Sequence, residues 1–157
     1  MATRLQDIWQ DVDLCGSSVQ EWMQTGISGA QVYGHMFAVV DLSSGADEVK
    51  TLADQELLGI RPYVSWKTPL EVVNWQVNDF GRFVFVTIAE RDPTGSAEQA
   101  YRTWFPDHWH MTPGEGVCPS CGSGGVLSFG MHNFGRVPVE VFYRKRKPGT
   151  VDPLGLS

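Results

Sequence analysis

Residues 60–90 read IRPYVSWKTPLEVVNWQVNDFGRFVFVTIAE, and this stretch decides the fold class. It contains three runs rich in β-branched and aromatic residues, at 63–66, 72–75 and 83–88. A Thr-Pro break separates the first two runs, and the Asn78-Asp79-Phe80-Gly81 turn separates the last two. Such runs between turn residues are typical of β-strands. The stretch therefore predicts a three-stranded β-meander, and it holds no cluster of acids, bases and nucleophiles.

A helix is predicted on the N-terminal side of this stretch, over about 18–31. Ser18 and Glu21 have the spacing of a capping box, in which both side chains satisfy free backbone N–H groups at a helix start. Gly26 and Gly29 weaken the helix by about 1 kcal/mol each relative to alanine. We expect these two glycines to permit close packing against a neighbouring element.

The remaining regular elements follow from the pattern of apolar residues and turn signals. A second helix is predicted over 46–58, and further strands over 36–42, 100–109, 126–131 and 137–143. The last two strands are expected to pair around the turn at 132–135, and 111–125 reads as an irregular loop insertion. The prediction is a single α+β domain over 1–157, with a mainly antiparallel sheet and about two helices in the first third.

Length and charge exclude several classes of function. The chain has 157 residues, enough for about one domain, and no apolar run approaches the roughly 20 residues that a membrane helix needs. Its 18 acidic and 12 basic residues give a formal net charge of −6, which argues against broad nucleic-acid binding. The N-terminus lacks the apolar core of a signal peptide, so synthesis inside the cell is expected.

Several short blocks occur in a fixed order along nearly the whole chain. They are DVDLCGSSV at 11–19, GHMFAVVD at 34–41, RPY at 61–63, PLEVVNW at 69–75, FVTIAE at 85–90, YRTW at 101–104, HNFGRVPV at 132–139 with FY at 142–143, and DPLGLS at 152–157. These blocks and their order resemble the middle of the portal proteins of tailed bacteriophages.

The resemblance implies a structural role in genome packaging and head-tail connection, without enzymatic activity. Members of this family form a dodecameric ring at one capsid vertex. DNA passes through the ring, and terminase, capsid and head-completion proteins bind to it. The expected location is therefore the virion, after synthesis in the host cytoplasm, with no membrane partner.

The resemblance implies that this chain corresponds to only a part of a full-length portal protein. The resemblance covers the α+β wing region and stops before the long helices that line the channel, so the chain is predicted to be a single partial domain. No channel-lining, DNA-binding or terminase-binding residue is carried over. Exposed sheet edges left by the truncation are expected to favour oligomerisation.

Cys118 and Cys121 suggest an alternative function. The C-x-x-C spacing is half of a zinc knuckle, and a structural zinc site needs four ligands. His108, His110 or His132 would have to supply the missing ligands. The alternative is therefore a small zinc-stabilised binding module; the portal resemblance itself requires no cofactor. With Cys15 unpaired, a disulfide framework is not expected.

Asp107, His108 and His110 suggest a third possibility, a histidine-dependent hydrolase. On a strand, His108 and His110 would share one face and Trp109 would point to the other. No group of carboxylates accompanies them. Surface or strand-edge histidines are the simpler interpretation.

Three residues are predicted to have structural or interface roles. Arg136 could pair with a neighbouring carboxylate and fix a strand or a subunit contact, or it could be a surface arginine in a turn. Trp75 and Pro138 belong to two of the resembling blocks. Tryptophans bury large areas in cores and also anchor interfaces. The basic run at 144–147 reads as a solvated charge run.

Overall fold

The computed structural model describes residues 3–42, 51, 53, 57, 59–91, 99–114 and 126–145. Within them, helices α1 (Thr3–Gln10) and α2 (Val19–Tyr33) precede eight strands. The strands are β1 (His35–Leu42), β2 (Pro62–Lys67), β3 (Val72–Val77), β4 (Phe83–Arg91), β5 (Gln99–Trp104), β6 (His108–Pro113), β7 (Ser128–Met131) and β8 (Val139–Tyr143). The predicted α+β class with mainly antiparallel sheet is confirmed. No helix in the described ranges is long and apolar enough to cross a membrane.

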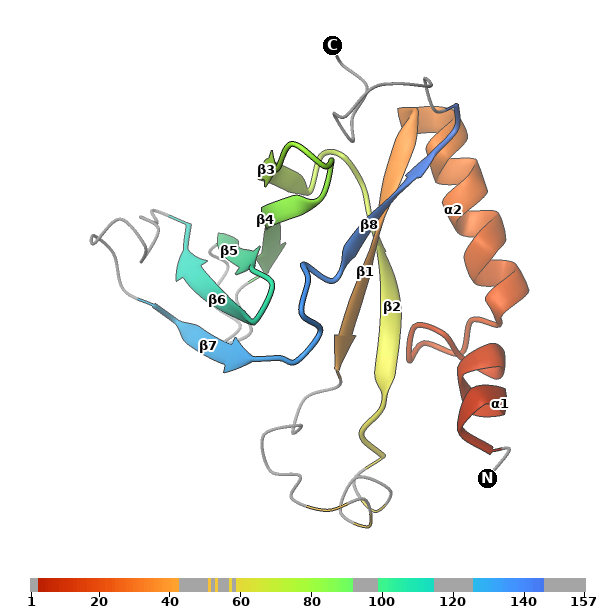
Figure 1. Cartoon of the computed structure of the whole chain (residues 1–157). Coiled ribbons are helices and arrows are strands. Elements are labelled where there is room, and N and C mark those ends of the chain that lie inside the picture. The colour runs from red at the N-terminus through yellow and green to blue at the C-terminus, as the bar shows by residue number, and fades with distance from the viewer. Residues whose placement is uncertain are drawn as a thin grey trace.

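The strands form two antiparallel sheets. One has the order β2-β1-β8 and the other β3-β4-β5-β6-β7. The two sheets face each other, and α2 lies against the far side of the three-stranded sheet, so the layers are sheet, sheet and helix (Figure 1). The core lies between the two sheets.

The predicted meander is only partly right. Strands β3 and β4 form the expected hairpin, with the N–H of Gly81 donating to the carbonyl of Asn78 across the turn. Strand β2, however, pairs with β1 in the other sheet. Its side chains are half-buried on both faces, with Trp66 toward α2 and Tyr63 toward Asp41, which contacts Arg102 of the five-stranded sheet. A strand that lies between α2 and the five-stranded sheet belongs to the three-stranded sheet and cannot pair with β3.

Two other strand predictions are corrected. The run at 100–109 is two strands, β5 and β6, joined by a tight turn in which Phe105 N–H donates to the His108 carbonyl. Strands β7 and β8 do not pair with each other, because β7 pairs with β6 and β8 with β1. The segment between them crosses from one sheet to the other, with Val137 buried in the core.

The helices also differ from the prediction. Helix α2 begins as expected, because Ser18 and Glu21 form the complete capping box, and it ends at Gly34, which has a left-handed backbone conformation (φ 85°). Helix α1 was not predicted at all. The helix predicted over 46–58 falls mostly outside the described residues.

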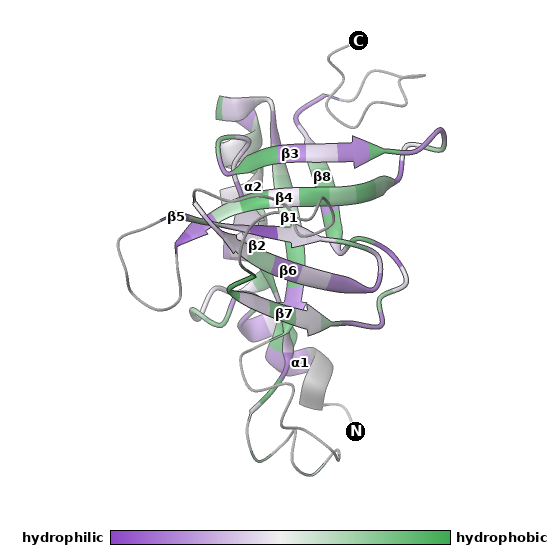
Figure 2. Ribbon diagram, turned by 90° about the vertical axis from the view of Figure 1, so that its left-hand side faces the viewer, coloured by the Kyte–Doolittle hydropathy of each residue, from purple (hydrophilic) through white to green (hydrophobic). Residues whose placement is uncertain are grey.

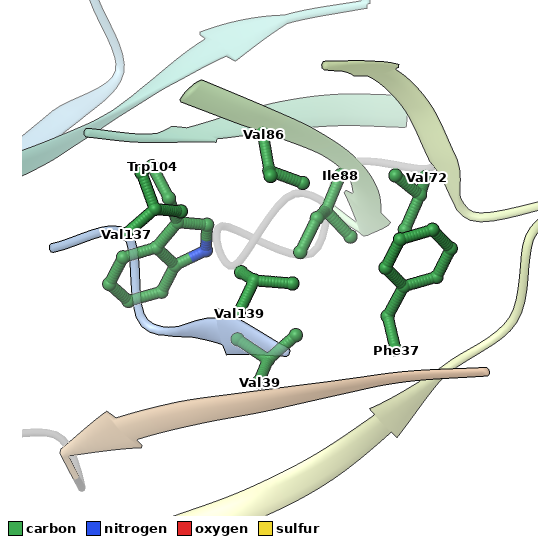
Figure 3. Close-up of a cluster of buried hydrophobic side chains, with 8 residues drawn as sticks. All are labelled: Phe37, Val39, Val72, Val86, Ile88, Trp104, Val137 and Val139. Atoms are coloured by element: carbon green, nitrogen blue, oxygen red, sulfur yellow. The ribbon is translucent and has the colours of Figure 1, made fainter. Parts of the chain in front are cut away.

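The apolar core is contributed by both sheets. Figure 3 shows its side chains pointing toward one another across the space between the sheets. They come from β1, β3, β4, β5, β8 and the crossover before β8, and they are Phe37, Val39, Val72, Val86, Ile88, Trp104, Val137 and Val139. Burial of such side chains is worth about 1.5–3 kcal/mol each, so this cluster holds the two sheets face to face.

Two tryptophans join α2 to the three-stranded sheet. The rings of Trp22 and Trp66 stack with centroids 4.2 Å apart, and each indole N–H donates to a backbone carbonyl of the other element. The Trp66 ring also lies against Gly26, where a Cβ atom would overlap it. The expected role of Gly26 in close packing is thereby confirmed.

A matched pair of substitutions tests this packing. We expect Gly26→Ala to lower the free energy of unfolding by about 1–3 kcal/mol, because the added methyl overlaps a rigid indole, which outweighs the gain in helix propensity. Gly29→Ala in the same helix meets the flexible end of Met36, so its effect should be much smaller. Urea denaturation of both variants measures the difference, and equal effects would contradict the packing argument.

Candidate functional site

Five polar side chains meet at one end of the space between the sheets. Asp41, Tyr63, Lys67, Glu90 and Arg102 come from β1, β2, β4 and β5, and we call them the intersheet network. Strand alternation places them there, because Asp41 follows Phe37 and Val39 on the same face of β1. The network therefore continues the apolar core toward the solvent.

Arg102 is the centre of the network. Its Nη1 donates to Asp41 Oδ2 at 2.8 Å, and its Nε lies 3.1 Å from Glu90 Oε2 without the alignment of a hydrogen bond. The Tyr63 hydroxyl donates to the same Asp41 oxygen at 3.2 Å. Lys67 Nζ lies 3.6 Å from Glu90 Oε1. The guanidinium also sits 4.6 Å from the centre of the Trp109 ring.

The charged side chains of the intersheet network are largely shielded from solvent. The side chains of Asp41, Lys67, Glu90 and Arg102 are only 17–20% exposed. Burial and the nearby Asp41 carboxylate raise the pKa of Tyr63 to about 12, so its hydroxyl stays a hydrogen-bond donor at neutral pH. An arrangement in which each cation faces a carboxylate is suited to joining the two sheets.

A shallow hollow adjoins the network. It has a volume of about 480 Å³ and is lined by Lys67, Leu70, Glu71, Ala89, Glu90, Arg91 and Gln99. Lys67, the network residue that lines the hollow, is already contacted by Glu71 and Glu90. Among the lining residues, the lysine is therefore already paired with carboxylates.

A second ion pair fixes the segment between the two helices. Arg61 Nη2 lies 2.6 Å from Asp11 Oδ2, and Nη1 donates to the Asp11 carbonyl. Beside it, the N–H of Val64 in β2 donates to the Val12 carbonyl at 2.9 Å. These bonds attach the chain before α2 to the edge of the three-stranded sheet.

The histidines on β6 lie together, as strand alternation predicts. The ring centres of His108 and His110 are 6.2 Å apart, and His108 Nδ1 lies 2.7 Å from Asp107 Oδ1. Phe105 stacks on His108 at 4.6 Å and contacts His110 at 5.3 Å. Phe129 of β7 lies 5.6 Å from His108, which makes a continuous row of rings across the outer face of the five-stranded sheet.

The expectation of surface histidines is wrong for His110. It is 5% exposed, and His132 after β7 is 9% exposed. The Nε2 atom of His110 is buried without a hydrogen-bond partner in the described part of the chain, and that of His132 is buried near the carbonyls of Phe105 and His108 without the geometry of a hydrogen bond. Burial lowers the pKa of both rings below the usual 6.5, although for His132 the carbonyls of Phe105 and His108 and the Asp107 carboxylate oppose this in part. Both histidines are therefore neutral at pH 7.

The other predicted site residues that the structure describes are Arg136, Trp75 and Pro138, and none of them belongs to the intersheet network. Arg136 is a surface residue whose Nη1 is 3.4 Å from Glu140 Oε1, with both side chains more than 70% exposed, so it combines the two alternatives, a surface arginine that lies beside a neighbouring carboxylate. Trp75 packs against the core cluster, and Pro138 is buried, with its carbonyl accepting from Val40 N–H. Cys118 and Cys121 lie outside the described residues. Among described residues, no group of three or more His, Cys, Asp or Glu is placed to hold a metal ion.

Sequence reasoning gave no role to the residues of the intersheet network. A signal was present, because Asp41 ends an apolar strand and Arg102 stands among aromatic residues. A charge in a buried strand is retained only when it is paired. The identity of its partner depends on which strands face each other, and strand patterns do not contain that information.

Comparison with known proteins gives no assignment. No family model matches the chain, and no curated protein is found to be similar to it.

Proposed function

We propose that this chain is a structural subunit of the portal type, corresponding to part of the wing region of a phage portal ring. In this role it is not an enzyme. It contributes packing surface to an assembly at one capsid vertex, where the full-length family also contacts terminase, capsid and head-completion proteins. DNA would pass through the complete ring, and no DNA site is assigned to this chain.

The observation that supports the proposal is the convergence of the resembling blocks. Asp11 of the first block pairs with Arg61 of the third, and Asp41 of the second contacts Tyr63 and Arg102 of two others. Glu90 of FVTIAE lies beside the same Arg102.

The block that contains Pro138 joins the same region of the fold. The Pro138 carbonyl accepts a hydrogen bond from the N–H of Val40, which lies in the second block. These contacts join residues 12 to 98 positions apart, as expected when a shared sequence pattern encodes a shared fold. Most of them lie where the two sheets meet, and the Asp11–Arg61 pair lies at the edge of the three-stranded sheet.

Two observations test the portal proposal. A gene for a large terminase upstream and a capsid gene downstream are expected beside the coding sequence. Mass spectrometry of phage particles purified from the source should detect this chain together with capsid peptides. Particles that contain capsid peptides but lack this chain, combined with a gene neighbourhood without phage genes, would contradict the proposal.

The Cys118-Pro119-Ser120-Cys121 spacing favours the second candidate function, a zinc-stabilised binding module. Under that hypothesis the protein purified without added metal contains stoichiometric zinc, and a chelator lowers its melting temperature. Under the portal proposal the two cysteines hold no metal, so a chelator leaves the melting temperature of the wild type unchanged. Thermal unfolding with and without chelator separates the two.

A further inference from the structure

The four edges of the two sheets are not equally protected against pairing with another chain. An exposed strand edge presents free N–H and C=O groups, and proteins usually block such edges with covering chain, charges or bulges. In β2, both backbone groups of Val64 are used, because its N–H donates to Val12 and its carbonyl accepts from the Trp22 indole. The β2 edge is therefore blocked at Val64, near the middle of the strand.

Two further edges carry other protective features. Strand β3 has two irregularities in its pairing with β4, and it exposes Asn74 and Gln76. Strand β8 contains the exposed Glu140 and is followed by Arg144 and Lys145, which are also exposed. Bulges and charges of this kind discourage the addition of a strand.

Strand β7 has none of these features within the described residues. It is the terminal strand of the five-stranded sheet, as Figure 2 shows in a view onto the outer face. No Asp, Glu, Lys or Arg occurs between positions 126 and 135. The exposed apolar side chains around it are Val126 (46%), Leu127 (44%), Phe129 (57%), Met131 (66%) and Phe134 (38%).

We propose that β7 is a self-association edge, at which a second copy of this chain adds its own β7 in the antiparallel direction. The partner edge must itself be unprotected, uncharged and apolar. Of the four strand edges described, only β7 meets that requirement, so the complementary surface is the same strand of another copy. The contact is isologous, with a two-fold axis at the middle of the strand pair.

Strand alternation fixes which side chains meet in such a pair. Phe129 and Met131 point to the outer face, while Gly130 is buried beneath the Trp109 ring on the opposite face. Residues opposite each other in an antiparallel pair point to the same face. With the axis at Gly130, Phe129 of each copy lies opposite Met131 of the other, and the two sheets form one continuous sheet.

Electrostatics favour this edge over the rest of the surface. Two copies with a formal net charge of −6 each repel one another, and the repulsion is smallest where neither presents a charged group. At about 150 Å² for a large side chain, the exposed fractions supply on the order of 400 Å² of apolar contact per copy. Stable interfaces bury about 800 Å² per partner, so the dimer is expected to be weak, with a dissociation constant in the micromolar range or above.

The proposal does not depend on the portal function. A ring closes through heterologous contacts, whereas β7 pairing is isologous and uses one surface twice. Failure of the β7 proposal would leave the gene-neighbourhood and particle tests unaffected, and the reverse is also true.

Sedimentation velocity of the whole chain from low micromolar to near-millimolar concentration tests the proposal. The expected result is a concentration-dependent shift from monomer to dimer. Met131→Lys should abolish the shift, because a charge on β7 blocks strand addition. The matched control is Val32→Lys, at a site 76% exposed on α2, which should dimerise as the wild type does. Either lysine changes the net charge from −6 to −5, so general repulsion decreases in both variants.

Hydrogen exchange locates the contact. Backbone amides of 128–131 should become more protected at high concentration in the wild type and in Val32→Lys, and circular dichroism should show that Met131→Lys remains folded. A wild type that stays monomeric, a Met131→Lys variant that dimerises as before, open-ended growth beyond the dimer, or protection confined to other strands would each overturn the proposal.

Discussion

Replacing Arg102 by methionine is expected to lower the free energy of unfolding by about 3 kcal/mol. The substitution keeps most of the apolar stem but leaves Asp41 and Glu90 as carboxylates that are 17–18% exposed and have lost their main cation. Removing one partner of a buried ion pair costs about 3–5 kcal/mol, and the residual exposure places this site at the lower end of that range. For a protein of this size the melting temperature should fall by about 6–12 °C. Thermal and urea denaturation measure both quantities.

Arg136→Ala provides the matched control. Arg136 also pairs with a carboxylate, but it is 74% exposed and its partner Glu140 is 73% exposed. Exposed pairs contribute about 0–1 kcal/mol, so the melting temperature should change little. A double variant with Asp41→Asn and Arg102→Met should recover part of the lost stability, because it removes one of the unpaired carboxylates. Equal effects for Arg102→Met and Arg136→Ala would disprove a structural role for the network.

Acid is expected to destabilise the protein below about pH 6.5, through His110 and His132. Burial lowers the pKa of both rings in the folded state, and the Nε2 atom of His110 is buried without a hydrogen-bond partner among the described residues. The unfolded chain therefore binds more protons than the folded one in the window between the lowered pKa values and about 6.5. Stability is complete above this window and decreases as the pH falls through it, by up to about 1.4 kcal/mol per pH unit for each histidine.

The measurement is the free energy of unfolding as a function of pH, for the wild type and for His110→Phe. The phenylalanine keeps an aromatic ring beside Phe105 and cannot be protonated, so the slope below pH 6.5 should become smaller. Thr103→Val serves as the control, because Thr103 lies opposite His110 in the β5–β6 pair and is also buried. It should shift the free energy equally at every pH. An unchanged slope in His110→Phe would refute the titration argument.

Sequence signals predicted helix starts and turns correctly where a few neighbouring residues are enough to form them. The capping box at Ser18 and Glu21 starts α2, and the Asn78–Gly81 turn joins β3 to β4, because both act through hydrogen bonds within a few residues. Helix α1 was missed because its eight residues carry no acidic residue in the first turn and no basic residue in the last, so it lacks the usual signals of a helix end.

Partner choice between strands was not predictable in the same way. The pattern at 63–66 describes a strand equally well beside β3 or beside β1, and the patterns at 126–131 and 137–143 are compatible with one hairpin or two sheets. The histidine pair on β6 illustrates the same limit. Alternation placed His108 and His110 on one face, but the burial of His110 depends on what the rest of the fold places around it.

The amino-acid sequence by itself determined the class of fold, the start of α2, the turn between β3 and β4 and the absence of a charge on the strand that became β7. These features depend on backbone preferences and side-chain chemistry over a few neighbouring positions. Only the tertiary structure decided that Asp41 meets Arg102, that Trp66 rests on Gly26, and that β7 ends a sheet. Such contacts join positions tens of residues apart, and the packing of the whole core selects them from many pairings that are locally equivalent.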